Sequence, residues 1–387
     1  MSVTAAQGFV AAGGPAGVKG DGRPDLALVV TADHRPVPAA GVFTRNEMTA
    51  APVEVSRSHL GATGGHAAAI VLNSGNANAA TGADGLEHAA QMTVATADAL
   101  GCAAEQVLVC STGLIGIPLP VEPILRTVPD LAGRLSVDGG GAAAEAILTT
   151  DTVAKEVVVP CGPAVVGGMA KGAAMLAPNM ATMLAVLTTD AAVEPVTLAT
   201  LLADSVADTF NQLIVDGAMS TNDTVLLLAS GQAGPVPEND LGAAVEQACA
   251  SLAHQMAVDA EGATKVVRIV ITGAADDADA RRAARTVATS QLTKCSWYGE
   301  RAYWGRVASD VGSSGVAFDQ ASLSVSYGGV AVAAGGVAVA HDLDVVVRHM
   351  EGRDLDLGVD LGLGDGRAEV LTTDLTHAYI DENMGDS

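Results

Sequence analysis

Short apolar runs of strand length alternate with stretches of helical periodicity along the whole chain, and this alternation constrains the fold more than any other feature. Such alternation is typical of α/β proteins. Strands are expected at residues 26–31, 69–72, 106–110, 156–159, 164–166, 183–187, 225–228, 264–272 and 322–327. Helices are expected at residues 86–100, 198–210, 241–258 and 278–290. We therefore predict an α/β protein.

Length and composition indicate two packed lobes. A chain of 387 residues can bury a large core, and its 49% hydrophobic and 17% charged residues argue against disorder. Because only 3% of the residues are aromatic, the core must be built from Ala, Val, Leu and Ile. A shift in composition near residues 274–279 predicts the boundary between a larger domain, residues 1–278, and a smaller C-terminal α/β lobe, residues 279–387.

The charge balance argues against nucleic acid as a partner. The chain has 20 basic and 44 acidic residues, a formal net charge of −24, whereas phosphate binding requires clustered Lys and Arg. The acidic balance is compatible with a cationic small substrate, but solubility explains it equally well.

The cysteines and the apolar runs predict a cytoplasmic protein. Five dispersed cysteines without a C-x-x-C pair fit reduced thiols better than a disulfide framework or a zinc site. The N-terminus lacks a signal-peptide pattern, and the apolar run at 330–340 is too short and too rich in glycine to span a bilayer. We expect no membrane association.

Several common catalytic and binding motifs are missing from the sequence. No phosphate-binding P-loop, Rossmann glycine fingerprint or G-x-S-x-G elbow occurs, and the eight histidines form no H-x-x-x-H pair. The sequence therefore predicts no bound metal and no resident cofactor.

The segment 171–184 contains the strongest nucleophile candidate. Thr182 follows the small residue Ala181 at the start of an apolar run, so its hydroxyl could attack the carbonyl of Ala181 and cut the chain. The new N-terminal threonine would carry both a nucleophile and an α-amine with a pKa near ~8. An ordinary threonine packed at the start of a strand fits these local features as well.

Three other segments could line a site. Thr112 and Gly113 follow an expected strand and could aim backbone N–H groups at an oxyanion, although an ordinary turn explains them too. Residues 73–82, rich in Asn and Gly, could line a polar pocket or simply form turns. Glu261 could hold a substrate amine, although a solvated loop glutamate is the commoner outcome. The cluster at 149–152 is similarly ambiguous, since it could line the site or be no more than a capping cluster.

Taken together, these segments closely resemble the bifunctional ornithine acetyltransferases (glutamate N-acetyltransferases) of arginine biosynthesis, over nearly the whole chain. The order and spacing of many blocks carry the resemblance. They are residues 41–46 with 51–53, 73–82, 111–116, 149–152, 167–172, 178–184, 220–224, 261–265, 304–306 and 374–376.

The resemblance implies a fold, an activity and a set of site residues. It implies a layered sandwich of sheets flanked by helices, of the N-terminal-nucleophile kind, cut between Ala181 and Thr182 into an α chain, 1–181, and a β chain, 182–387. The reaction would move acetyl from N2-acetylornithine to glutamate through acetyl-threonine, with acetyl-CoA as a possible second donor. An α2β2 assembly would be expected. Catalysis would fall on Thr182 with Thr112 and Gly113, and substrate contacts on Thr149, Lys171, Thr182, Glu261, Asn383 and Ser387.

Three positions depart from the family pattern. Ala174 replaces a glycine, residues 301–303 read Arg-Ala-Tyr where Asp-Pro-Asn is usual, and Ser387 follows Asn383 by four positions instead of five. A paralogue acting on another N-acyl amino acid, as an amidohydrolase or peptidase, and a non-catalytic binding paralogue therefore remain alternatives to the transferase.

Overall fold

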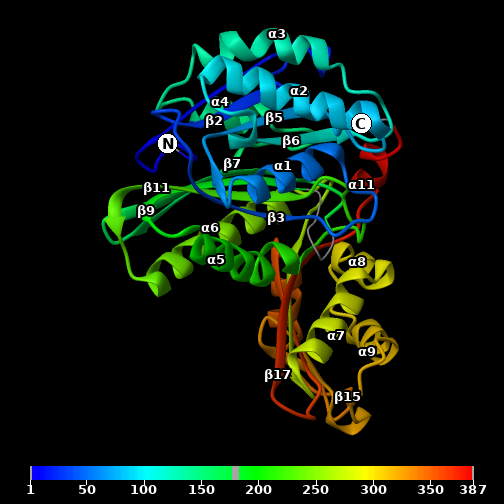
Figure 1. Cartoon of the computed structure of the whole chain (residues 1–387). Coiled ribbons are helices and arrows are strands. Elements are labelled where there is room, and N and C mark those ends of the chain that lie inside the picture. Colours follow the sequence, from blue (N-terminus) through cyan, green and yellow to red (C-terminus); the bar gives the residue numbers. More distant parts are fainter. Residues whose placement is uncertain (1, 177–182, 386–387) are drawn as a thin grey trace. The chain divides into compact units, whose positions relative to one another are not determined.

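A computed structural model describes residues 2–176 and 183–385 of the chain and divides it into two compact units. The first unit comprises residues 2–176, 183–211 and 218–256, and the second comprises residues 212–217 and 257–385. Figure 1 shows the elements of each unit along the chain.

The first unit contains two β-sheets. The strand order is β1-β2-β5-β6 in the first sheet and β4-β3-β11-β9-β8-β7 in the second. The strands of the first sheet are β1 (Phe9–Gly14), β2 (Leu26–Thr31), β5 (Ala69–Asn76) and β6 (Val107–Leu114). Those of the second are β3 (Val37–Phe43), β4 (His66–Ala67), β7 (Lys155–Cys161), β8 (Ala164–Lys171), β9 (Leu184–Ala192) and β11 (Thr224–Pro235).

Helices cover the outer faces of the two sheets (Figure 1). Helices α2 (Gly82–Leu100) and α3 (Val121–Ala132) lie over the first sheet, and α5 (Pro195–Asp208) and α6 (Glu238–Val258) lie under the second. Helix α5 begins at a proline, which is preorganised for the first helical turn, and α2 ends at Gly101 with a φ of 73°, a left-handed cap. The remaining elements of this unit are α1 (Ala51–Ala62), α4 (Gly140–Ala146), and the 3-10 turns η1 (Ala104–Gln106) and η2 (Phe210–Gln212), whose last residue opens the second unit.

Alternating side chains of the first sheet contribute to two cores, one on each face of the sheet. In β2, Ala27 and Val29 face the second sheet, whereas Leu26, Leu28 and Val30 pack beneath α2 and α3. Both faces of the strand are buried, so it reads as a continuous apolar run rather than an alternating one. The resulting order of layers is helix, sheet, sheet, helix, and the predicted layered α/β sandwich is confirmed.

The second unit is a smaller α/β lobe built on one mixed sheet. The strand order is β10-β17-β12-β16-β13-β14-β15, and α7 packs against β12 and β17. Buried Trp297 and Tyr327 are the largest side chains of its core. The strands are β10 (Leu213–Ile214), β12 (Val266–Ala274), β13 (Ser324–Tyr327), β14 (Val330–Ala334), β15 (Val337–Ala338), β16 (Asp354–Asp360) and β17 (Gly366–Thr373). The helices are α7 (Asp277–Thr289), α8 (Gln291–Tyr298), α9 (Trp304–Ser313), η3 (Gln320–Ser322), α10 (Leu343–Glu351) and α11 (His377–Glu382).

The predicted domain boundary at 278/279 falls inside this second unit, and the structure corrects it. Strand β12 pairs in parallel with β16 and antiparallel with β17, which begin about 90 and about 100 residues later in the chain. These pairings draw the chain from residue 257 onward into the second unit, ahead of the composition shift that suggested the boundary.

A short segment at 212–217 also belongs to the second unit, although the chain on both sides belongs to the first. Strand β10 pairs in parallel with β17, and the buried Lys294 Nζ donates to the carbonyl of Val215 at 2.6 Å and to Thr372 Oγ1 at 3.1 Å. Desolvation lowers the pKa of Lys294 to about 8, against the opposing attraction of Asp216 and Asp374. A buried lysine therefore fastens this segment to the sheet.

Among the described residues, no helix has the length and apolar character needed to cross a membrane.

Replacing Lys294 by methionine should change how the stability of the second unit depends on pH. Because the folded pKa of about 8 lies below the ordinary 10.5, burial of the charge opposes folding below about pH 8, and this cost disappears as the pH rises to 10.5. The free energy of unfolding of the wild type should therefore gain about 3 kcal/mol relative to Lys294→Met across this window. Urea denaturation followed by tryptophan fluorescence measures it, since both tryptophans lie in this unit. A difference that does not vary with pH would contradict the assignment.

Candidate functional site

Polar residues gather where the parallel strands β5 and β6 end side by side in the first unit. The register places Asn73 opposite Ser111 and Ser74 opposite Thr112. Ser111 Oγ donates to Asn73 Oδ1 at 2.6 Å, and Asn73 Nδ2 donates to the carbonyl of Asn76 at 2.9 Å. The carboxyl ends of parallel strands are where α/β proteins place binding groups, so this edge is the first component of a candidate site.

Gly113 adopts a backbone conformation that only glycine tolerates at this edge. Its φ is +132°, and a Cβ atom there would lie 2.3 Å from the carbonyl carbon of Gly75 and 2.5 Å from the amide of Asn76. Thr112, its buried neighbour, is also a predicted site residue. The expected turn at 111–113 is instead part of β6, which continues to Leu114, because β5 supplies ladder partners up to Asn76.

Asn222 links the ends of the two sheets within the first unit. It lies just before β11 of the second sheet, yet its Nδ2 donates to the carbonyl of Ser111 at 2.9 Å and to that of Ala77 at 2.6 Å. Thr221 Oγ1 donates to Asn222 Oδ1 at 2.5 Å, which fixes the orientation of the amide. Asn222 therefore holds the Thr112–Gly113 edge against the start of β11.

Asp223 holds the backbone at the start of β9. The amide N–H of Met183 donates to Asp223 Oδ1 at 2.9 Å, and the carboxyl group is fully buried. Desolvation raises the pKa of Asp223 well above its usual range, against the opposing effects of the Met183 N–H, the Lys171 charge and the Ser220 hydroxyl. Its Oδ2 has no hydrogen-bond partner among the described residues. This carboxyl thus anchors the residue that directly follows Thr182 in the sequence.

Lys171 is the last residue of β8 and lies at the same end of the second sheet as the start of β9 and the start of β11. It pairs with Leu184 of β9, and Leu184 in turn pairs with Thr224 of β11, so Lys171 lies two strands from the segment that carries Asp223. Its side chain is almost fully buried, at 3% exposure.

Asp151 organises the residues around Lys171. Lys155 Nζ lies 2.6 Å from Asp151 Oδ1, whereas Lys171 Nζ lies 3.9 Å from Asp151 Oδ2. The amides of Gly172 and Thr149 donate to the same carboxylate at 2.7 and 3.1 Å. Desolvation alone would raise the pKa of Asp151, but the charges of Lys171 and Lys155 outweigh it and hold the pKa at about 2. Lys155 is the closer ionic partner of Asp151. The Asp151 carboxylate also contacts Thr149 and Lys171, and so brings these two predicted residues together.

The predicted substrate residues Glu261 and Asn383 meet in the second unit. Asn383 Nδ2 donates to Glu261 Oε2 at 2.7 Å, and Glu261 is buried. The following Gly262 has a φ of +63°, and a Cβ atom there would lie 2.4 Å from the amide of Tyr379 on α11. Glycine therefore lets the turn that carries Glu261 approach the helix next to Asn383.

The described residues of the predicted set form three separate groups, two in the first unit and one in the second. Thr112 and Gly113 share one strand edge, Thr149 and Lys171 share Asp151, and Glu261 pairs with Asn383. Ala181, Thr182 and Ser387 lie outside the described residues.

The sequence predicts no role in the site for Asn222 or Asp223, which link the end of β6 and the start of β9 to the start of β11. Both residues belong to a polar run that directly precedes the expected strand at 225–228. A polar run next to a buried strand was the signal that the sequence offered. Asp151 was interpreted as a possible capping residue, whereas it pairs with two lysines. Among the residues that the structure describes, no group of His, Cys, Asp and Glu has the arrangement of a metal site.

Cys110, next to the Thr112–Gly113 edge, is a buried thiol. Its side chain lies in the core between the two sheets, and desolvation raises the pKa of the thiol to about 12. This environment makes Cys110 a packing residue and not a nucleophile.

Comparison with known proteins gives matches along almost the whole chain. The family model of the ArgJ family matches residues 10–385. Two curated relatives are named "Arginine biosynthesis bifunctional protein ArgJ": one from Mycolicibacterium paratuberculosis is 51% identical and covers 99% of this chain and 96% of its own length, and one from Streptomyces coelicolor is 48% identical and covers 99% of both. A solved structure of ornithine acetyltransferase complexed with ornithine from Mycobacterium tuberculosis is 42% identical over 46% of this chain and 94% of that chain, with a TM-score of 0.41.

Replacing Asp151 by asparagine should destabilise the first unit by about 3 kcal/mol at neutral pH, because the buried Lys155 and Lys171 lose their carboxylate. Since the pKa of Asp151 lies below the ordinary 3.8, its stabilising effect is complete above about pH 4 and is lost as the pH falls toward about 2. The difference from wild type should shrink over the same range. Urea denaturation followed by circular dichroism measures it, with Asp98→Asn, an exposed carboxylate on α2, as the control. Equal effects of the two substitutions would contradict the assignment.

Proposed function

Because the chain belongs to the ArgJ family, we propose that it is an acetyltransferase that moves an acetyl group from N2-acetylornithine to glutamate. The observation that carries this proposal is the family match over residues 10–385, together with relatives at about half identity over full length. The described geometry supports it, because the first unit gathers Thr112, Gly113 and Lys171 around the residues next to Thr182.

We propose that Thr182 becomes the nucleophile by autoproteolysis. Its Oγ attacks the carbonyl carbon of Ala181, the peptide bond breaks after transfer of the acyl group to oxygen, and water hydrolyses the ester. Ala181 then ends an α chain, 1–181, and Thr182 begins a β chain, 182–387. The freed α-amine is the nearest base for the Thr182 hydroxyl.

In the first half-reaction, Thr182 Oγ attacks the acetyl carbonyl carbon of N2-acetylornithine while its proton passes to the α-amine. The bond between the acetyl carbon and N2 of ornithine then breaks. N2 takes the proton from the α-amine of Thr182, and ornithine leaves. In the second half-reaction, the amine of glutamate attacks the acetyl-threonine, its proton passes to Thr182 Oγ, and N-acetylglutamate leaves.

Thr112 and Gly113 are the proposed oxyanion donors. Fixed donors at the site of developing charge typically contribute a factor of ~10²–10³ in kcat. The close approach of Gly113 to Gly75 and Asn76, which excludes any Cβ, supports this role because it fixes the backbone there before substrate binds.

Two charged residues, Lys171 and Glu261, are proposed to select the substrate. Lys171, with Thr149 beside it, would bind a carboxylate, and Glu261 would bind an ammonium group. Asn383 donates to Glu261 and would orient its carboxylate, with Ser387 as a further contact.

Asp223 is the proposed positioning residue for the nucleophile. It acts through Met183, whose N–H it accepts, and so fixes the backbone next to Thr182. A displacement of about 1 Å at a reacting group can cost ~10²-fold in rate.

Three expectations from the resemblance remain proposals. The relatives are named bifunctional, which fits a second activity. The second activity to test is the acetylation of glutamate with acetyl-CoA as the donor in place of N2-acetylornithine. An α2β2 assembly and a cytoplasmic location are the expected state of the enzyme.

Intact-mass analysis of wild type and Thr182→Ala tests the nucleophile. Wild type should give two chains split between Ala181 and Thr182, and N2-acetylornithine should add one acetyl group to the β chain. Thr182→Ala should remain one chain without acetyl, whereas Thr200→Ala, on the exposed face of α5, should behave as wild type.

An uncut but active wild type would refute the nucleophile assignment. A cut enzyme that releases acetate faster than it forms N-acetylglutamate would instead favour an amidohydrolase, and a cut protein that takes up no acetyl group would favour a binding paralogue.

Substitution of Asp223 tests the positioning role. Asp223→Ala leaves the buried N–H of Met183 without its acceptor and should lower kcat/KM by ~10–100-fold, with slower cleavage. Asp223→Asn keeps an oxygen acceptor and matches the neutral carboxyl that burial favours, so it should stay within about threefold of wild type. Steady-state kinetics measure both, and a loss equal in the two variants would point to a required negative charge instead.

A further inference from the structure

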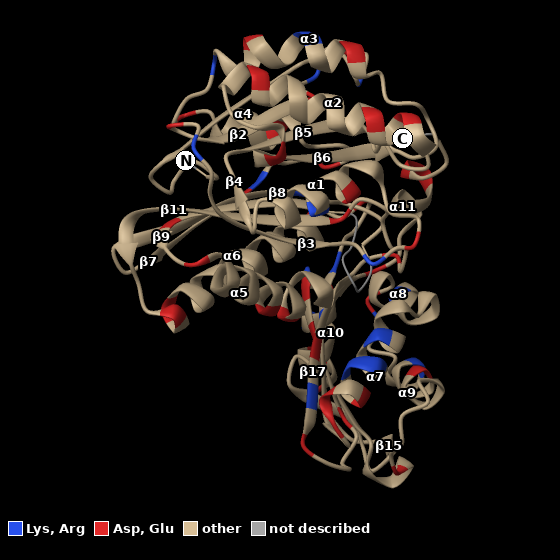
Figure 2. Cartoon of the chain, in the orientation of Figure 1, with Lys and Arg blue, Asp and Glu red and all other residues tan. Residues whose placement is uncertain are grey.

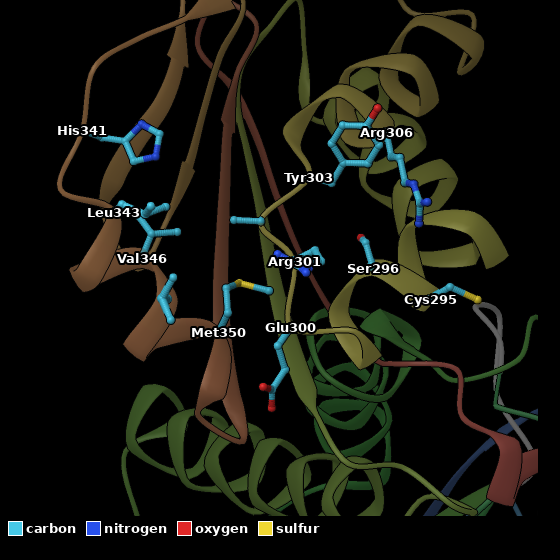
Figure 3. Close-up of a pocket in the computed structure, with 12 residues that line it drawn as sticks. Cys295, Ser296, Glu300, Arg301, Tyr303, Arg306, His341, Leu343, Val346 and Met350 are labelled. Carbon is cyan, nitrogen blue, oxygen red and sulfur yellow. The ribbon is translucent and has the colours of Figure 1, made fainter.

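The second unit contains a cavity of about 440 Å³ that shares no residue with the predicted acetyl-transfer site. It is lined by the segment from Cys295 to Arg306 and by His341 to Met350, so one wall comes from α8, α9 and the loop between them and the other from α10. Figure 3 shows Arg301 in the middle of the cavity, with His341 and Leu343 on one side and Tyr303 and Arg306 on the other. A cavity of this size fits a small organic molecule.

Two arginines give this cavity a positive lining. Among the described residues, neither Arg301 nor Arg306 forms an ion pair, although the chain carries 44 acidic side chains, which Figure 2 shows spread over both units. The lining carboxylate, Glu300, lies 2.8 Å from Lys265 and is therefore already paired. The positive charge of the two arginines is left for a ligand.

The Arg306 guanidinium is held in place before any ligand binds. Its Nη1 donates to the carbonyl of Leu292 at 2.6 Å, and its central carbon lies 5.1 Å from the centre of the Tyr303 ring, a cation–π contact. Because a guanidinium has five N–H donors, several remain for a carboxylate. A fixed arginine of this kind suits bidentate recognition of a planar anion.

The opposite wall is apolar and unusually exposed. Leu343 and Val347 lie four residues apart on α10, on one face of the helix, and are 63% and 42% exposed. Val346 and Met350, on the neighbouring face, are buried in the core of the unit and close the bottom of the cavity. Tyr303 is 55% exposed across from them. Exposed apolar side chains gathered around one cavity mark a binding surface.

We propose that this cavity binds a small organic carboxylate that carries an apolar tail. The carboxylate contacts Arg301 and Arg306, and the tail lies against Leu343 and Val347. Residue 301 is usually an aspartate in the family that the sequence resembles, and an aspartate here would repel an anion. This chain has the cation Arg301 instead. The proposal is independent of the acetyl-transfer reaction.

Titration calorimetry with octanoate tests the proposal, with octanamide and octylamine as neutral and cationic probes of the same tail. Octanoate should bind wild type saturably at one site, and octanamide at least tenfold more weakly, because a charge-assisted contact is lost. Arg301→Gln and Arg306→Gln should each weaken octanoate binding at least tenfold, whereas Arg281→Gln, an exposed arginine on α7 outside the cavity, should have no effect. Tryptophan fluorescence of Trp297 and Trp304 checks that each variant is folded.

Alkylation of Cys295 gives a second readout that does not depend on activity. It is the exposed cysteine of the five and lies at the rim of the cavity. Octanoate should slow its reaction with iodoacetamide in wild type but not in Arg301→Gln, as followed by mass spectrometry. Absence of saturable binding, equal binding of octanoate and octylamine, or wild-type affinity in both arginine variants would overturn the proposal.

Discussion

The hydrogen bonds of Asn222 and Asp223 at the start of β11 are the constraint on which the first unit's polar edge depends. One residue reaches across to the end of the first sheet, at Ser111 and Ala77, and the next holds Met183 at the start of β9. The two sheets, which pack against each other through apolar side chains, are thereby also linked at their polar ends. This pair of contacts therefore fixes Met183, at the start of β9, relative to the strand edge that carries Thr112 and Gly113.

Burial makes this arrangement rigid and also sets its charge state. Asp151 is kept ionised by two lysines, whereas Asp223 has a pKa raised by desolvation although it lies near Lys171. The two carboxyl groups therefore have different tasks: Asp151 fixes cations, and Asp223 accepts a backbone N–H. Environments that push two carboxyl groups apart in pKa are common at catalytic sites, which is consistent with the proposed acetyl transfer.

The sequence predicted elements well where local pattern decides them and less well where distant partners do. Strand β2 has the predicted bounds because its apolar run is complete and ends at polar turns. Strands β5 and β6 extend into Asn- and Gly-rich residues that locally favour turns, because each strand supplies the other's ladder. The domain boundary depends on the pairing of β12 with strands far along the chain, and the contact of Lys171 with Asp151 depends on how β7 and β8 fold back, so residue pattern alone could not place either. Residue pattern alone indicates Thr182, Thr112, Gly113 and Glu261 as candidates, whereas Asn383 and Ser387 follow only from the resemblance, and neither predicts the cavity at Arg301.

We propose that the acetyl group passes through the side chain of Thr182. Tandem mass spectrometry of enzyme quenched in acid during turnover with N2-acetylornithine tests this most directly, because it assigns the acetyl group to one residue. The account predicts a hydroxylamine-sensitive ester on the N-terminal threonine of the β chain. An acetyl group found on another residue, such as Lys171, or a turning-over enzyme that carries none, would contradict it.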